Sequence, residues 1–369
     1  MRLVLAGAGH AHLHLLAHAA SLRAADLDVT LIAPAAFHYS GLATGVLSGA
    51  LPESAAMIDV AALAAQQGVR HLPTNIVAVD LAAQVTRTAE GENQAFDLIS
   101  FNIGSVVRDP LNLAAAPGVW PVKPLTRLFD LRKQLEAMLS RDRRSPHVVV
   151  AGGGQTGFEV AAAIAGLCER HGQVARLTLV SPHPATWAPR AAVADLLPRL
   201  RGRGIVILQG EVTGRGDGHC RLADGRDLEC EMLVLAGGLT APSLTGGLGL
   251  AMDAAGRLLL NPELQALDHP AVFAAGDCAV IAEAPRPPVG VFGVRAAPIL
   301  LANLIARAQA GPLRPYRPQG RWLSIMDLGD ETGLALRDKL WWRSRGALWV
   351  KRRLDLGFVA RARGLRLAA

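Results

Sequence analysis

Residues 147–159 read HVVVAGGGQTGFE, an apolar strand followed by a glycine-rich turn and the first residues of a helix. Gly152, Gly154 and Gly157 have the GxGxxG spacing, which is informative between a strand and a helix. The first glycine allows a tight turn, the second lets a diphosphate approach the backbone, and the third permits close packing of helix on strand. Unpaired N–H groups at the helix N-terminus favour an anion. We therefore predict a dinucleotide-binding turn, with a βαβ turn that holds no ligand as the alternative.

A similar unit opens the chain, where RLVLA at residues 2–6 leads into GAGH, an Ala/Leu/His-rich helix and a second strand. Gly7 and Gly9 keep the spacing of the glycine turn, but His12 occupies the position of the third glycine. We expect a second dinucleotide-binding turn here, with a weaker motif than the first.

The position that recognises the ribose of a dinucleotide lacks an acid in both units. A carboxylate at the end of the second strand normally binds a ribose hydroxyl, and that position holds Ala33 in the N-terminal unit and Ser181 in the later one. The missing hydrogen bond costs the N-terminal site about 1.5–3 kcal/mol of cofactor affinity. Ser181 leaves the choice between NADH and NADPH open.

The two units continue in the same way. Residues 68–105 and 204–239 each combine an apolar strand after a glycine, two short strands around a polar turn, and a buried strand that ends in glycine. In the second copy, Asp224-Gly225 is a strong hairpin signal. A proline-spaced segment from 105 to 146 connects the copies. The pattern predicts an α/β protein with two Rossmann-like nucleotide-binding domains.

The composition excludes several classes of protein. With 369 residues, 51% of them hydrophobic, the chain can build a large core, so disorder and small disulfide scaffolds are excluded. Its four cysteines form no CxxC, which gives neither a zinc motif nor a dithiol motif and favours a reducing compartment. No run of 18 uncharged apolar residues occurs, so we expect no membrane-spanning segment. The apolar N-terminus resembles a signal peptide, but glycines and histidines interrupt it.

A pair of cysteines and a run of histidines each allow two interpretations. Cys220 and Cys230 fall near opposite positions across the second hairpin, where we expect free thiols and where a disulfide is the alternative. His10, His14 and His18 have i,i+4 spacing on a helix, which is suited to a metal. Because no nearby carboxylate or cysteine completes a ligand set, we predict no metal site.

The net charge of +7 comes from one segment. Residues 339–369 carry nine basic residues and one acid, Asp355, so residues 1–338 sum to 7 − 8 = −1. Trp341, Trp342 and Trp349 lie in the same segment. Arg interleaved with Trp, Leu and Val at helical spacing fits an interfacial helix on an anionic membrane, and a domain-closing helix with a solvated basic face fits equally well. We expect no nucleic-acid partner, because no recognition motif is present.

Four ordered elements carry a resemblance to a known family: GAGH at 7–10, GGGQTGFE at 152–159, LVLAGG at 233–238 and AVFAAGDC at 271–278. Together they resemble the flavoproteins with two dinucleotide-binding domains of the pyridine nucleotide-disulfide oxidoreductase superfamily. The resemblance implies FAD in the first domain and NADH or NADPH in the second, which is inserted in the first. It implies an FAD-binding domain at 1–113 and 240–310, an NAD(P)-binding domain at 114–239, and a C-terminal region at 311–369.

The same resemblance implies the cofactor-binding positions. Asp277 would bind the ribityl or phosphate end of FAD, and Gly104 and Gly237 would end the strands at which the chain crosses between domains. The full implied set is Gly7, Gly9, His10, Ala11, Tyr39, Val77, Gly104, Gly276, Asp277, Gly152, Gly154, Gln155, Thr156, Gly157, Ser181 and Gly237.

Three side chains are candidates for the chemistry. Glu159 matches the Glu of the family's GxxGxE and would lie near the nicotinamide, with a helix-entry carboxylate as the alternative. Lys123 of PVKP would lie close to the flavin or the nicotinamide, with a solvated linker lysine as the alternative. Arg295, at the start of a helix expected to point at the flavin, would stabilise the anionic reduced flavin, with a surface ion pair as the alternative.

Within the superfamily the chain resembles the type II NADH dehydrogenase branch, and most of all the flavoprotein domain fused to selenide, water dikinase. The segments that carry this resemblance are YSGLATG, FDLISFNIGS, PVKP and VFGVRAAP. The CxxxxC of disulfide reductases is missing, which excludes dithiol chemistry. GVRAAP at 293–298 departs from the AQxAxQ quinone motif of type II dehydrogenases, so the acceptor is a quinone or another small molecule.

The resemblance implies an FAD-dependent NAD(P)H dehydrogenase that passes hydride to the flavin and electrons on to that acceptor. The alternative is a non-catalytic or regulatory FAD-binding protein of the same fold. The expected location is the cytoplasm, and the basic tail leaves open a peripheral attachment at the inner face of the membrane. A homodimer is also left open.

Overall fold

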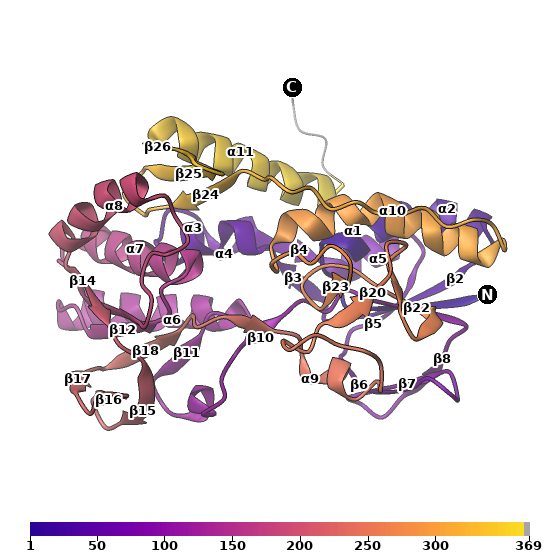
Figure 1. Cartoon of the computed structure of the whole chain (residues 1–369), viewed down its shortest axis with the longest axis horizontal. Helices are drawn as coiled ribbons and strands as arrows, with labels where there is room; N and C mark the ends of the chain where they lie inside the picture. Colours follow the sequence, from indigo (N-terminus) through magenta and orange to yellow (C-terminus); the bar gives the residue numbers. More distant parts are fainter. Residues whose placement is uncertain (365–369) are drawn as a thin grey trace.

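The computed structural model describes residues 1–364 and shows an α/β molecule built on two separate sheets (Figure 1). In the larger sheet the strands nearest the first glycine turn run parallel, and Phe96, Phe101 and Phe273 are buried beside them. Its eight strands follow the order β23 (Ala279–Ile281), β20 (Leu258–Leu260), β21 (Gln265–Ala266), β22 (His269–Ala274), β9 (Leu98–Phe101), β1 (Arg2–Ala6), β2 (Asp28–Ile32) and β5 (Arg70–Leu72).

Helices and a small sheet cover the larger sheet. Helices α1 (His10–Ala17), α2 (Ala19–Ala24), α5 (Val60–Gln66) and α10 (Gly290–Ala308) lie on one side in Figure 1, and β6 (Ile76–Asp80), β7 (Val85–Thr88) and β8 (Asn93–Ala95) lie on the other. The excursion between β2 and α5 contains β3 (Ala36–His38), the short helices η1 (Ser40–Leu42), α3 (Ala43–Leu47) and α4 (Glu53–Ala56), and β4 (Met57–Asp59).

Helix α10 corrects the expected start of this helix. We expected it to start at Arg295, but it begins at Gly290 and Pro298 lies inside it. This first turn packs against the Gly276 segment, since a Cβ on Gly293 would lie 3.4 Å from the Cα of Gly276.

By length and composition, α10 is also the one helix in the described part of the chain that could cross a membrane. Its side chains indicate a helix packed against the protein instead. Asn303 is fully buried, donates to the carbonyl oxygens of Glu263 and Arg314, and accepts from the N–H of Arg314.

The second sheet is parallel throughout and holds the second glycine turn. Its order is β11 (Val119–Pro121), β18 (Met232–Leu235), β12 (His147–Ala151), β13 (Arg176–Ser181) and β14 (Ile205–Gln209). Helices α6 (Thr126–Ala137), η3 (Met138–Asp142), α7 (Gln155–Arg170) and α8 (Arg190–Gly202) flank it, together with the meander β15 (Val212–Gly216), β16 (His219–Leu222) and β17 (Asp227–Glu229). The expected hairpin at Asp224-Gly225 is confirmed between β16 and β17.

The chain crosses between the sheets twice, and the two crossing segments pair with each other. Strand β10 (Val106–Val107) runs antiparallel to β19 (Leu239–Thr240), with the short helices η2 (Leu113–Ala115) and α9 (Ser243–Gly246) nearby in sequence. The second sheet is therefore inserted in the first, which confirms the expected fold of two Rossmann-like domains. The boundaries at 113/114, 239/240 and 310/311 stay a proposal.

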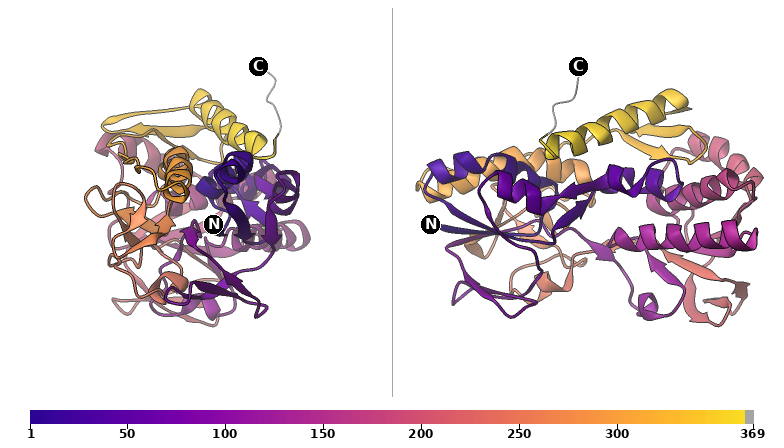
Figure 2. Two further views of the ribbon diagram at one scale, coloured as in Figure 1. Left: turned by 90° about the vertical axis from the view of Figure 1, so that its right-hand side faces the viewer. Right: turned by 180° about the vertical axis from the view of Figure 1, so that it is seen from behind.

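The C-terminal region bridges both sheets. It forms a meander of β24 (Ser324–Asp327), β25 (Gly333–Arg337) and β26 (Leu340–Ser344), followed by α11 (Arg345–Ala362). Figures 1 and 2 show α11 lying along the molecule across both halves. The tail from residue 339 was expected to be a helix, but its first residues are a strand, because Leu340–Ser344 completes the ladder with β25.

Two glycines let the meander approach α7 closely. A Cβ on Gly166, in the middle of α7, would lie 2.3 Å from the carbonyl oxygen of Gly329. Arg203 reinforces this contact by donating to the carbonyl oxygens of Leu328 and Ala162.

We expect Gly166→Val to lower the free energy of unfolding by about 1–3 kcal/mol, since the added methyl groups must push the meander off α7. Urea denaturation of the full chain measures the change. The matched control is Gly202→Ala at the end of α8, where a Cβ meets open space and where a gain of up to about 1 kcal/mol is expected. Equal stability of the two variants would contradict this account of the interface.

Candidate functional site

The N-terminal glycine turn is organised by Asn102, at the carboxyl end of β9. Its Oδ1 accepts hydrogen bonds from the N–H groups of Ala11 (2.9 Å) and His12 (3.2 Å), and its Nδ2 donates to the carbonyl oxygen of Ala275 (2.6 Å). A Cβ on Gly9 would lie 2.5 Å from that Oδ1. Asn102 therefore explains why Gly9 is required and fixes α1 beside the Gly276-Asp277 segment.

His12 shows what replaces the third glycine of this turn. The ring is fully buried, with Nδ1 2.6 Å from the carbonyl oxygen of Gly7 and Nε2 2.8 Å from the hydroxyl of Ser100. Burial lowers the pKa of His12 to about 4, so the ring is neutral at pH 7. It links helix to strand by hydrogen bonds in place of the close approach that a glycine permits.

The implied FAD-binding residues His10 and Asp277 lie together with Lys123, a candidate for the chemistry. Lys123 Nζ donates to Asp277 Oδ2 at 2.9 Å and to the hydroxyl of Ser105 at 2.6 Å. Burial alone would raise the pKa of the Asp277 carboxyl, but Lys123 and Ser105 outweigh it and hold that pKa below its usual value. Burial also lowers the pKa of His10 to about 4. Since Lys123 follows β11 and Asp277 follows β22, this ion pair joins the two domains.

The residues of the first turn fit FAD. Gly104 faces open space, and α1 begins at His10 with its N-terminus at the turn, where the dipole favours a diphosphate. An ionised Asp277 is a suitable acceptor for hydroxyl groups. Val77, also in the implied set, is exposed on β6.

The second glycine turn has the geometry of an open dinucleotide site. Gly152 has a φ of +139°, and a Cβ on Gly157 would lie 1.9 Å from the carbonyl oxygen of Gly152, so both positions require glycine. A Cβ on Gly154 would meet nothing within 4 Å. Helix α7 begins directly after it at Gln155 and Thr156, and its N-terminus is therefore free to receive an anion.

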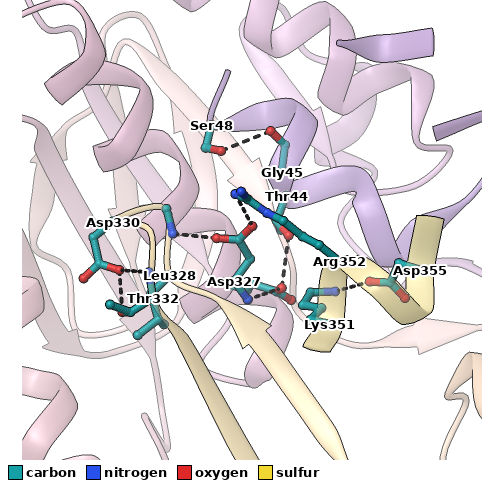
Figure 3. A network of polar contacts seen from close by, with 12 residues as sticks. Thr44, Gly45, Ser48, Asp327, Leu328, Asp330, Thr332, Lys351, Arg352 and Asp355 are labelled. Atoms are coloured by element: carbon teal, nitrogen blue, oxygen red, sulfur yellow. Dashed lines mark hydrogen bonds and ion pairs between the residues drawn. The ribbon is translucent and has the colours of Figure 1, made fainter. Parts of the chain in front are cut away.

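Glu159 is buried and forms polar contacts with the first domain and the C-terminal region. Figure 3 shows Thr44, Asp327 and Lys351 of this network. Glu159 Oε1 accepts from the hydroxyl of Thr44 on α3 (3.0 Å) and from the N–H of Asp327 on β24 (2.8 Å). Burial raises the pKa of the Glu159 carboxyl, and Lys351, the Asp327 N–H and Thr44 offset only part of that effect. Because both bonds converge on Oε1, Oε2 is the oxygen that can hold a proton.

Lys351 of α11 supplies the positive charge of this network. Its Nζ donates to Asp355 Oδ2 at 2.9 Å and to the carbonyl oxygen of Gly41 at 2.6 Å. Burial alone would lower the pKa of Lys351, but Glu159, Asp355 and Asp327 raise it above its usual value. Arg352 adds a second cation, 3.5 Å from Asp327.

An aromatic cluster continues the network toward the first glycine turn. Tyr39 donates to Asp355 Oδ1 at 2.9 Å and stacks on Phe358 of α11, with ring centroids 4.8 Å apart. The ring of His10 contacts both, at 5.4 and 5.2 Å. Burial and Asp355 raise the pKa of Tyr39, so the phenol stays protonated. The inner face of α11 thus forms one wall of the site.

Arg295 is not brought to this cluster. Its side chain is exposed in the second turn of α10, whereas the N-terminus of that helix, at Gly290, lies beside His10.

Ser181 and Gly237 lie at the second glycine turn. A Cβ on Gly153 would lie 2.5 Å from Ser181 Oγ, and Gly237 follows the end of β18. Among the described residues, no group of three metal-ligating side chains occurs.

Sequence analysis missed Asn102, Lys351, Asp327 and Asp355. Asn102 had a readable signal, because a polar residue at the carboxyl end of a buried parallel strand faces the ligand edge of the sheet. Lys351 was counted with the surface charge of the tail, and nothing local distinguishes it from its neighbours. Asp355, the lone acid of the tail, lies four residues after Lys351, and this i,i+4 spacing was the available clue.

Comparisons with known proteins agree with this geometry. The model of the family described as pyridine nucleotide-disulphide oxidoreductase matches residues 1–298. An NADH dehydrogenase-like protein of Mycobacterium tuberculosis is 27% identical over 236 residues, which cover 61% of this chain and 59% of that protein, so the chain spans less than two thirds of that relative. A type II NADH:quinone oxidoreductase of the same organism is 28% identical over 345 residues, covering 82% of this chain and 72% of that protein.

Solved structures share the fold. NDH2 from Plasmodium falciparum in complex with NADH superposes with a TM-score of 0.81 at 13% identity, covering 97% of each chain. The sulfide:quinone oxidoreductase of Aquifex aeolicus gives the same TM-score at 16% identity, covering 98% of this chain and 91% of that chain.

The raised pKa of Glu159 predicts a pH-dependent stability. A carboxyl whose pKa is raised by folding contributes stability below its unfolded pKa of about 4.3 and loses that contribution as the pH rises through the folded value. The Tm of Glu159→Gln minus the Tm of the unaltered chain should therefore increase between about pH 4 and about pH 8. Calorimetry measures it, with the exposed Glu90→Gln as control. A difference that stays constant or falls with pH would disprove the buried, proton-binding state of Glu159.

Proposed function

The chain belongs to the pyridine nucleotide-disulphide oxidoreductase family, and we propose that it is an FAD-dependent NAD(P)H dehydrogenase that passes electrons to a quinone or another small acceptor. The observation that carries the proposal is the bond between Glu159 and Thr44, because it joins the helix of the second glycine turn to the first domain. The finer resemblance, to the flavoprotein domain fused to selenide, water dikinase, stays a prediction based on its motifs.

The chain's own residues would bind and orient the two cofactors and hold a proton between the domains. Gly7, Gly9, His10 and Asp277 would hold FAD, and Gly152, Gly154 and Gly157 would hold the diphosphate of NAD(P)H. When bound, FAD supplies a ring that accepts hydride from a nicotinamide and passes electrons on. Lys123 keeps Asp277 ionised and the domains in contact. Glu159 Oε2 is placed to hold a proton between the domains, with Lys351 stabilising the carboxylate when that proton leaves.

We propose further that no disulfide takes part. All four cysteines are free and buried, Cys220 and Cys230 among them. Cys278, next to Asp277, has its pKa raised to about 12 by burial, which leaves it without thiolate character at neutral pH.

Anaerobic titration with NADH and with NADPH tests the dehydrogenase. The FAD-loaded protein should be yellow, should bleach with at least one nucleotide, and should regain its colour when a quinone is added. Bleaching without FAD release would support turnover, whereas FAD binding without bleaching would support the non-catalytic alternative. Protein that stays colourless after reconstitution would refute both.

A variant pair sharpens this test. Lys123→Met leaves the carboxylate of Asp277 without its cation, and flavin reduction should slow by about tenfold, the equivalent of one charge-assisted hydrogen bond of about 1.4 kcal/mol. The control is Lys133→Met on α6, whose side chain is 64% exposed. Equal rates of flavin reduction for Lys123→Met and Lys133→Met would show that Lys123 does not contribute to the site.

We also propose that α11 attaches the protein to an anionic membrane surface. Its outer face carries a groove of about 360 Å³ lined by Trp349, Leu354, Leu356, Arg353 and Arg361, together with Val350 and Gly357. Trp349 is 62% and Leu356 39% exposed. Exposed apolar side chains bordered by arginines fit the boundary between headgroups and acyl chains. These exposed side chains of α11 do not bear on a homodimer, which stays an expectation.

Flotation with vesicles of phosphatidylglycerol and phosphatidylcholine tests the attachment. The unaltered chain should float, and Trp349→Ser with Leu356→Ser should abolish flotation. Val294→Ser with Leu267→Ser, two exposed apolar residues on other elements, is the control and should float normally. Absence of flotation by the unaltered chain, or equal flotation of both double variants, would refute attachment through α11.

A further inference from the structure

The carboxyl end of β13 is where the second domain would hold the adenosine ribose of its dinucleotide. Ser181, the last residue of the strand, is buried directly against the glycine turn, since a Cβ on Gly153 would lie 2.5 Å from its Oγ. The same Oγ accepts a hydrogen bond from the N–H of His183 at 3.2 Å. A ribose with two free hydroxyls is normally bound here by a carboxylate, and the strand ends in a neutral hydroxyl instead.

The loop that follows β13 places an imidazole at this edge. Pro182 and His183 are both exposed, and the N–H of Ala185 donates to the carbonyl oxygen of Gly153 at 3.3 Å. This bond holds the loop against the glycine turn, so His183 lies two residues from the end of the strand with its side chain open to solvent.

A guanidinium reaches the same edge from the β16–β17 hairpin. Arg226 donates through Nη2 to the carbonyl oxygen of Gln209 at 3.1 Å, and Gln209 is the residue of β14 paired with Ser181. Gln209 in turn donates to the carbonyl oxygen of Pro182. The other bonds of Arg226, to Asp224, use Nε and Nη2, so Nη1 is available to a further acceptor.

The carboxylates nearby do not replace the missing acid. Asp224 is paired with Arg226, and Glu211 is exposed beyond the end of β14, the strand next to β13. The ribose edge thus presents the guanidinium of Arg226 and the imidazole of His183. A carboxylate at this edge would repel a phosphate, whereas these two groups do not. An arginine near this position is the usual way in which a Rossmann domain accommodates a 2′-phosphate, and its bonds to phosphate are charge-assisted.

We infer that the second domain takes NADPH in preference to NADH, an inference that rests on the proposed function of the chain as a nicotinamide dehydrogenase. Arg226 and His183 bind the 2′-phosphate, and the neutral hydroxyl of Ser181 does not repel it as a carboxylate would.

Calorimetric titration of the full chain with adenosine 2′,5′-bisphosphate and with adenosine 5′-phosphate tests the inference without flavin reduction. The bisphosphate should bind at least about tenfold more tightly, and Arg226→Gln and His183→Gln should each reduce that ratio. Ser181→Asp, which restores the carboxylate, should reverse the preference. Arg221→Gln on β16, an exposed arginine paired with Asp227, is the matched control and should keep the ratio.

The outcomes separate this inference from the proposed function. Equal binding of the two probes, or a ratio that Arg226→Gln and His183→Gln leave unchanged, would overturn the NADPH preference and leave the proposed dehydrogenase function standing. Tighter binding of adenosine 5′-phosphate that is lost in Glu211→Gln would assign the ribose to Glu211 and would also overturn it. If neither probe binds to folded protein, the inference and the nucleotide-binding function fall together.

Discussion

The arrangement of the molecule depends on the contacts that the buried ammonium group of Lys351 makes. A charge removed from water is tolerated only when several partners compensate it, and here the partners come from three parts of the chain: Glu159 from the second domain, the carbonyl of Gly41 from the first, and Asp355 from α11 itself. The C-terminal helix is therefore held against both domains at once. Loss of Asp355 would leave the buried ammonium group without its ion pair, and the charges and dipoles contributed by Glu159 and Gly41 couple the tail to the two domains.

This coupling gives the two faces of α11 different tasks. The inner face carries Lys351, Asp355 and Phe358 toward Glu159 and Tyr39, between the two glycine turns. The outer face carries Trp349 and Leu356 toward solvent. A molecule that approaches the outer face of α11 is thus separated from the buried network by a single helix.

The parts of this architecture that were predictable from sequence are those with local physical causes. The glycine spacing at 152–157 and the parallel-strand patterns follow from backbone geometry, and they predicted the two Rossmann-like domains. The candidates Glu159, Lys123 and Asp277 came from the family resemblance. The start of α10 was missed because Gly290 and Gly293 serve a contact with His10 and Gly276 that is distant in sequence. The partners of Asn102 are also distant in sequence, on α1 and at Ala275, whereas Lys351 was missed because its burial by the two domains cannot be read from the tail alone.

The charge of the tail illustrates how burial changes an argument from composition. Of the nine basic residues after position 338, Arg343, Arg345, Lys351 and Arg352 form ion pairs with acids of the chain, and Arg363 donates to carbonyl oxygens of α4 and β4. Lys339 is exposed in the turn before β26, away from α11, and Arg366 lies outside the described residues. Arg353 and Arg361 are the cations that line the outer groove. At about 1 kcal/mol per cation near an anionic surface, these two contribute about 2 kcal/mol, so the exposed apolar side chains of Trp349, Leu354 and Leu356 must supply most of any affinity for lipid.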